Sequence, residues 1–185
     1  VYKRQMWTEA QTPDGSGDDL LTGFEKVILH RDDPTSYLYR GIVFFHKGYY
    51  WLAEQDFRQA INQNETSSAA WYDLALTQQK RGNLDDSLTS YDKAIALRPE
   101  FLEAWYNRGM LAMDLGKNEE ALRSFQEILR FSPQSADAAN AMAVIYLQQG
   151  KYDAGRKALN KAGQINTANE RVHENLRLFR VELDR

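Results

Sequence analysis

The chain of 185 residues has no cysteine and only three histidines. Without cysteine it can form no disulfide framework, no thiolate nucleophile and no cysteine-ligated zinc site. The histidines, His30, His46 and His173, lie far apart and match no metal-ligand spacing such as HExxH. The sequence also contains no glycine-rich phosphate-binding loop. We therefore expect no catalytic residues, no cofactor and no metal site, and we expect that the protein is not an enzyme.

Long apolar runs and blocks of like charge are missing as well. No stretch approaches the roughly 18 apolar residues that a membrane span requires. The net charge is −3, without the charge blocks typical of a nucleic-acid-binding tail. We expect no membrane insertion by this chain and no nucleic-acid partner. The expected location is the cytoplasm, while a periplasmic or membrane-tethered location stays open if an upstream segment is missing.

What the chain does contain is a repeat of 34 residues. Four glycines follow one another at this interval, and tryptophan and proline pairs recur at the same spacing. Apolar residues between these markers are three or four apart, which is typical of amphipathic helices. Glycine is suited to the turn between two helices, because it accepts a positive φ without a Cβ clash. The positions that define the repeat are Gly48, Gly82, Gly116, Gly150, Trp71, Trp105, Pro99 and Pro133.

The pattern resembles the tetratricopeptide repeat (TPR) family. In residues 68–101 the family markers are Trp71, Gly82, Tyr91, Ala94 and Pro99. The resemblance implies an all-α fold, namely a right-handed α-solenoid of antiparallel helix pairs that forms a TPR-like superhelix. It predicts four repeats, at 34–67, 68–101, 102–135 and 136–169.

Both ends of the chain are expected to differ from the repeats. The first five residues, VYKRQ, resemble a translated sequencing-adapter end, so we expect the natural N-terminus to be missing. Together with a Pro-, Gly- and Ser-containing linker they make up residues 1–17. Apolar spacing predicts a capping helix at 18–33 and another at 170–185. Asp33 and Pro34 are expected to begin the first helix of the first repeat.

In such a solenoid the first helix of each repeat lines the concave face. Counting along the repeat predicts an aromatic, aliphatic and methionine-containing strip, which suits an extended peptide or a partner helix. The alternative is that single members of the strip only fill contacts between adjacent repeats. The strip comprises Leu38, Ile42, Phe45, Tyr72, Leu76, Gln79, Tyr106, Asn107, Met110, Met113, Asn140, Val144 and Leu147.

One branch of the TPR family binds the C-terminal carboxylates of peptides through Lys, Arg and Asn side chains. The matching residues in this chain are Leu38, Ile42, Asp73, Glu103 and Asn107. Two of them are carboxylates, which would repel such a ligand. We therefore do not expect this carboxylate-binding activity.

The sequence favours a non-enzymatic scaffold for protein–protein interaction that binds a peptide or a partner helix in a concave groove. Two alternatives stay open. The same faces could pack against another copy of the chain, in an oligomeric adaptor. The chain could also be the docking module of a larger enzyme or membrane-anchored protein. The identity of the partner does not follow from the sequence, because repeat proteins share a scaffold and differ in the residues placed on it.

Overall fold

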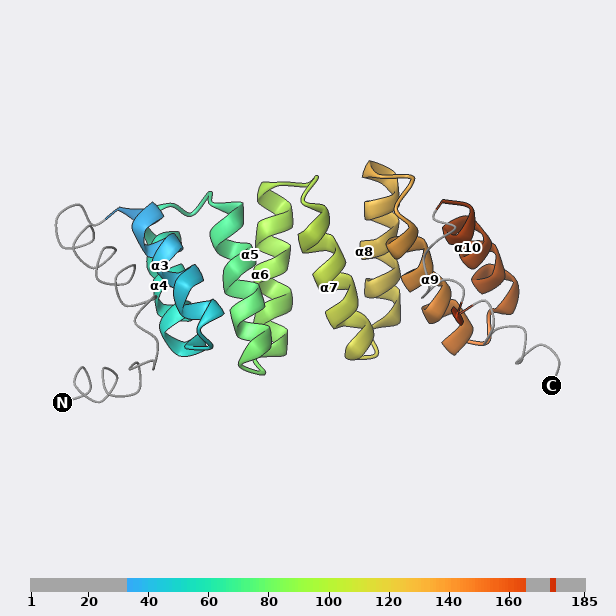
Figure 1. Cartoon of the computed structure of the whole chain (residues 1–185), viewed down its shortest axis with the longest axis horizontal. Helices are drawn as coiled ribbons and strands as arrows, with labels where there is room; N and C mark the ends of the chain where they lie inside the picture. Colours follow the sequence, from blue (N-terminus) through green and yellow to red (C-terminus); the bar gives the residue numbers. More distant parts are fainter. Residues whose placement is uncertain (1–32, 166–173, 176–185) are drawn as a thin grey trace. The chain divides into compact units, whose positions relative to one another are not determined.

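The computed structural model describes residues 33–165 and 174–175. The described residues form eight long helices and no strand, which confirms the all-α fold class. In chain order the helices are α3 (Pro34–His46), α4 (Tyr50–Gln63), α5 (Ser68–Lys80), α6 (Leu84–Leu97), α7 (Leu102–Asp114), α8 (Asn118–Phe131), α9 (Ala136–Gln148) and α10 (Tyr152–Ile165) (Figure 1). The expected linker at 1–17, nearly all of the helix at 18–33 and most of that at 170–185 lie outside the described residues.

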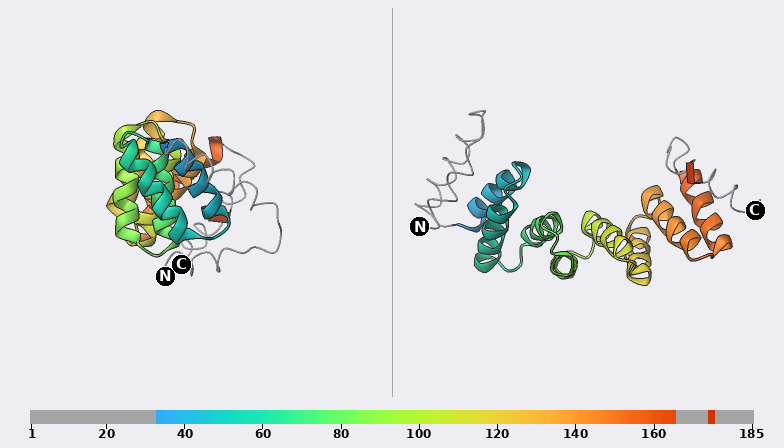
Figure 2. Two further views of the ribbon diagram at one scale, coloured as in Figure 1. Left: turned by 90° about the vertical axis from the view of Figure 1, so that its left-hand side faces the viewer. Right: turned by 90° about the horizontal axis from the view of Figure 1, so that it is seen from below.

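The helices pack in pairs, and each range expected for a repeat contains one pair. The chain divides into two compact units, Val1–Arg98 (unit 1) and Pro99–Arg185 (unit 2). In unit 1, α3 pairs with α4 and α5 with α6, and α4 joins the two pairs by contacting α5. Unit 2 repeats this arrangement with α7 to α10, joined through α8 and α9 (Figure 2). The superhelix expected over all four repeats stays a prediction, since it depends on how the two units are placed.

The four glycines of the repeat end the first helix of each pair. Gly48, Gly82, Gly116 and Gly150 have φ angles of 81°, 82°, 71° and 69°. These values lie in the left-handed region, which side-chain-bearing residues rarely adopt. The structure thus places the four glycines in the turns between paired helices.

Helix ends follow the capping chemistry that the sequence predicts. The Asp33 carboxylate accepts hydrogen bonds from the backbone N–H groups of Thr35 (2.9 Å) and Ser36 (3.2 Å) at the start of α3. Pro99 and Pro133 each come two residues after a second helix has ended. A proline at this place cannot continue the helix, so it separates one repeat from the next.

Two tryptophan side chains form hydrogen bonds with the turns between repeats. Trp71 Nε1 donates to the carbonyl oxygen of Glu65 (3.0 Å), and Trp105 Nε1 donates to that of Pro99 (2.8 Å). Both bonds span six residues and lead from a first helix back to the turn that precedes it. The indoles therefore fix the direction in which each first helix leaves its turn.

Candidate binding faces

The first helices of the two repeats in each unit are neighbours, because α3 contacts α5 and α7 contacts α9. We call their predicted strip residues the unit 1 face and the unit 2 face. Every residue of both faces is partly buried, so each side chain is anchored in the fold and also reaches the surface. The unit 1 face is Leu38, Ile42, Phe45, Tyr72, Leu76 and Gln79, and the unit 2 face is Tyr106, Asn107, Met110, Met113, Asn140, Val144 and Leu147.

The side chains of the unit 1 face are supported by contacts with buried residues of the core. Leu38, Ile42 and Phe45 pack against the buried cluster that includes Phe57. On α5 the support comes from Tyr91, which is fully buried on α6. The Tyr72 ring lies 6.0 Å from the Tyr91 ring, and the Tyr91 hydroxyl donates to Gln79 Oε1 (3.2 Å). Tyr72 and Gln79 are therefore positioned by a buried residue of the partner helix.

The unit 2 face has a similar aromatic support and one internal polar contact. The Tyr106 ring meets Phe125 of α8 edge-on, with centroids 5.8 Å apart. Asn140 Oδ1 accepts a hydrogen bond from Asn175 Nδ2 (2.8 Å). The amide of Asn140 is thus bound by the C-terminal part of the chain itself, a contact that the repeat pattern did not predict.

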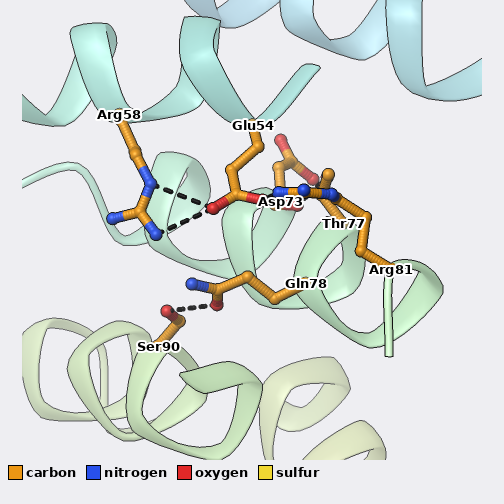
Figure 3. A network of polar contacts seen from close by, with 7 residues as sticks. All are labelled: Glu54, Arg58, Asp73, Thr77, Gln78, Arg81 and Ser90. Carbon is orange, nitrogen blue, oxygen red and sulfur yellow. Dashed lines mark hydrogen bonds and ion pairs between the residues drawn. The ribbon is translucent and has the colours of Figure 1, made fainter. Parts of the chain in front are cut away.

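A buried ion-pair network joins the two repeats of unit 1 (Figure 3). Glu54 of α4 is only 4% exposed. Its carboxylate accepts hydrogen bonds from Arg58 Nε (3.0 Å) and Nη2 (2.8 Å) and from Arg81, which caps α5. Burial by itself raises the pKa of Glu54, but the bonds from both guanidinium groups outweigh it, and the pKa lies below its usual value.

A second buried acid pairs within the first repeat. The Asp56 carboxylate forms a bidentate ion pair with Arg40, whose Nε and Nη2 each donate a hydrogen bond of 2.7 Å. Burial is the largest influence and raises the pKa of Asp56, although Arg40 lowers it in part. In the second repeat, Ser90 Oγ of α6 donates to the buried Gln78 Oε1 of α5 (2.7 Å). These buried polar groups of unit 1 are therefore all hydrogen-bonded, as buried polar groups usually are.

Asp73 of α5 differs from these acids. It is partly buried, yet its carboxylate forms no ion pair or hydrogen bond with any described residue, and the bond from Thr77 Oγ1 (2.7 Å) goes to its backbone carbonyl oxygen. Burial raises the pKa of Asp73 to about 6. The sequence alone identifies Asp73 only as a mismatch to carboxylate binding. One repeat later the neutral Asn107 occupies the same position, which indicates that the fold does not require a charge there.

In residues 33–165 and 174–175, no group of three or more histidine or acidic residues could hold a metal ion. No helix in this part of the chain is both long and apolar enough to cross a membrane.

Comparison with family models identifies the class of protein. Two models described as "Tetratricopeptide repeat" match residues 72–136 and 112–177, and together they cover more than half of the chain. The chain therefore belongs to the TPR family, as the sequence pattern predicted. A search of curated proteins found no match.

Solved structures show the same fold at low sequence identity. MamA superposes with a TM-score of 0.78 at 19% identity, over 83% of this chain and 90% of MamA. YrrB, described as a TPR protein with an unusual peptide-binding site, gives 0.75 at 23% identity, over 88% and 86%. A TPR protein from Parabacteroides merdae ATCC 43184 gives 0.74 at 23% identity, over 82% and 61%. At these identities the likeness establishes the fold and does not transfer a ligand.

Proposed function

We propose that the protein is a non-enzymatic interaction scaffold that binds an extended peptide, or one helix of a partner protein, on the unit 1 and unit 2 faces. Membership of the TPR family supports the general role, because proteins of this family are generally scaffolds. The peptide-binding site in the description of YrrB supports the choice of ligand.

The observation that carries the proposal is the partial burial of every residue on both faces. A ligand gains affinity from apolar side chains that are already ordered, because little conformational entropy is lost on binding. Met110 and Met113 add flexible apolar surface, which can adapt to a ligand's shape. The faces thus combine rigid anchors with adaptable contacts.

A selection of displayed random peptides against the full chain tests the proposal. The face variant Leu76→Asn/Met110→Asn removes apolar surface from each face without adding charge. The control variant Thr89→Asn/Gln126→Asn makes the same kind of change at exposed positions of the second helices α6 and α8. We expect the parent and the control to enrich one peptide motif, and the face variant to lose about tenfold or more of its affinity.

The opposite result would contradict the proposal, namely a motif that the face variant retains and the control loses. Circular dichroism should first show equal helicity for all three proteins. Sedimentation separates the self-association alternative, because a scaffold for other proteins remains a monomer of 21.4 kDa at all concentrations. A dimer that only the face variant disrupts would indicate that a second copy occupies the faces.

A further inference from the structure

We propose that Asp73 is a cation-binding subsite of the unit 1 face and accepts an arginine or lysine side chain of the partner. The inference rests on the proposed function, because it names the chemistry of the ligand for the same face.

Other acids that the fold shields from solvent are engaged within the chain. In unit 1, Glu54 and Asp56 bind arginines and Asp33 caps α3. In unit 2 the half-buried acids Glu120 and Glu127 pair with Arg108 and Arg130. Among the described residues, Asp73 is the shielded acid that lacks any such partner. A cation of the partner would give Asp73 the ionic contact that arginines of the chain give to most of the other acids.

Shielding makes the ionised form of Asp73 costly in the free protein. Burial raises its pKa to about 6, so the carboxyl is still mostly ionised at neutral pH. A cation at hydrogen-bond distance would favour this ionised form and remove part of the cost. Arg81, which caps the same helix, is bound to Glu54. Perturbed acids of this kind are found preferentially at functional sites.

The surroundings of Asp73 fit a long basic side chain. Tyr72 and Asp73 both interact electrostatically with Tyr91 of α6, and the Tyr72 ring is partly exposed, so that a guanidinium can stack on it. Leu76, one turn further along α5, is apolar and partly exposed, which suits the aliphatic stem of a basic side chain. Arginine should bind more tightly than lysine, because its planar group can pair with a carboxylate through two hydrogen bonds.

The repeat also shows one internal partner that Asp73 lacks. In unit 2 the hydrogen bond from Asn175 to Asn140 joins residues that are 35 apart. The same offset in unit 1 connects Asp73 with Leu38, which has no polar group to offer. The amide pair that unit 2 forms at this spacing therefore has no polar counterpart at Leu38 in unit 1.

The test uses two small probes and the full chain labelled with ¹⁵N. Nα-acetyl-L-arginine amide carries the cation, and Nα-acetyl-L-citrulline amide is its neutral isostere. We expect the arginine probe to shift backbone amide signals of α3 and α5 in a saturable way, and the citrulline probe to bind at least about tenfold more weakly. Asp73→Asn should bind both probes at the level of citrulline. Its fold is expected to persist, because Asn107 occupies the same repeat position in unit 2.

The inference is overturned if the arginine probe gives no saturable shift, if both probes bind equally, or if Asp73→Asn binds the arginine probe like the parent. These outcomes leave the proposed function standing if the peptide selection enriches a motif without a basic residue. Conversely, arginine binding at Asp73 without any enriched peptide would contradict the proposed function and support the subsite alone.

Discussion

Unit 1 and unit 2 build the junction between their two repeats differently, although the helices on either side have equal lengths. In unit 1, Glu54 of α4 pairs with Arg81 at the end of α5. Two repeats further along, unit 2 has Leu122 and Gln149 at the same positions. Gln149 Oε1 is buried without a hydrogen-bond partner among the described residues, and Gln149 Nε2 reaches Glu119 at 3.5 Å. The scaffold thus accepts either an ion pair or an apolar residue at one position.

The two binding faces also differ in whether a side chain at one repeat position is charged or neutral. The second repeat of unit 1 carries the shielded carboxylate of Asp73, and the first repeat of unit 2 carries the neutral amide of Asn107 at the same position of the 34-residue repeat. The repeat therefore sets the position of the backbone, whereas the charge of the side chain at that position differs from one repeat to the next. Exchanging the residues between units tests this directly.

The largest effect is expected from Leu122→Glu, which places the carboxylate of unit 1 into the junction of unit 2. No arginine stands at the positions equivalent to Arg58 and Arg81, which are Gln126 and Gln149. A buried carboxylate without a cation should lower the free energy of unfolding by about 3–4 kcal/mol. Urea unfolding followed by circular dichroism measures this loss.

The control is the double variant Leu122→Glu/Gln149→Arg, which adds the missing cation. If the two junctions are equivalent, it should recover at least about half of the lost stability. No recovery would mean that the side chains at this junction of unit 2 cannot meet as they do in unit 1.

A smaller loss is expected from Arg81→Met in unit 1. Glu54 then keeps only Arg58, whose side chain is half exposed, so the free energy of unfolding should fall by about 2–3 kcal/mol. The double variant Glu54→Leu/Arg81→Leu copies the leucines found one repeat later at 88 and 115. It should come within about 1 kcal/mol of the parent or exceed it. A double variant as unstable as Arg81→Met would refute the equivalence of charged and apolar junctions.

The smallest change, a gain, is expected from Asp73→Asn, which introduces the residue that the next repeat carries at this position, Asn107. The folded-state pKa of Asp73 is about 6, above the value of 3.8 for an unperturbed aspartate. A raised carboxyl pKa favours the folded state at low pH, and this contribution is lost as the pH rises through 6. The variant should therefore be about 1–2 kcal/mol more stable than the parent at pH 7, after allowance for partial solvent contact.

The pH profile provides the control for this variant. Its advantage should shrink between pH 6 and 4 and vanish below that range, where the aspartate is protonated in both the folded and the unfolded state. Asn107→Asp, the reverse exchange, adds a carboxylate to unit 2. An advantage of Asp73→Asn that is constant from pH 4 to 8 would show that ionisation of Asp73 is not the cause.

The sequence predicted the helix pairs closely because their signals are local. Gly82 marks the end of a first helix and Pro99 the end of a second by backbone geometry alone. The pair of Glu54 and Arg81 was not predicted, since it joins residues 27 apart through the conformations of two long side chains. The hydrogen bond between Asn140 and Asn175 was not predicted either, since it joins residues 35 apart in the chain. The shielding of Asp73 could not be predicted either, because burial depends on how neighbouring helices pack.

The titration of Asp73 is the most direct test of the difference between the two units. The measurement follows the ¹³C signal of its side-chain carboxyl carbon in the full chain, from pH 3 to 8. The account predicts a midpoint near pH 6, as expected for a shielded carboxyl without an internal cation. A midpoint at or below the ordinary aspartate value of 3.8 would mean that Asp73 is hydrated or paired, and it would remove the energetic basis of the cation subsite.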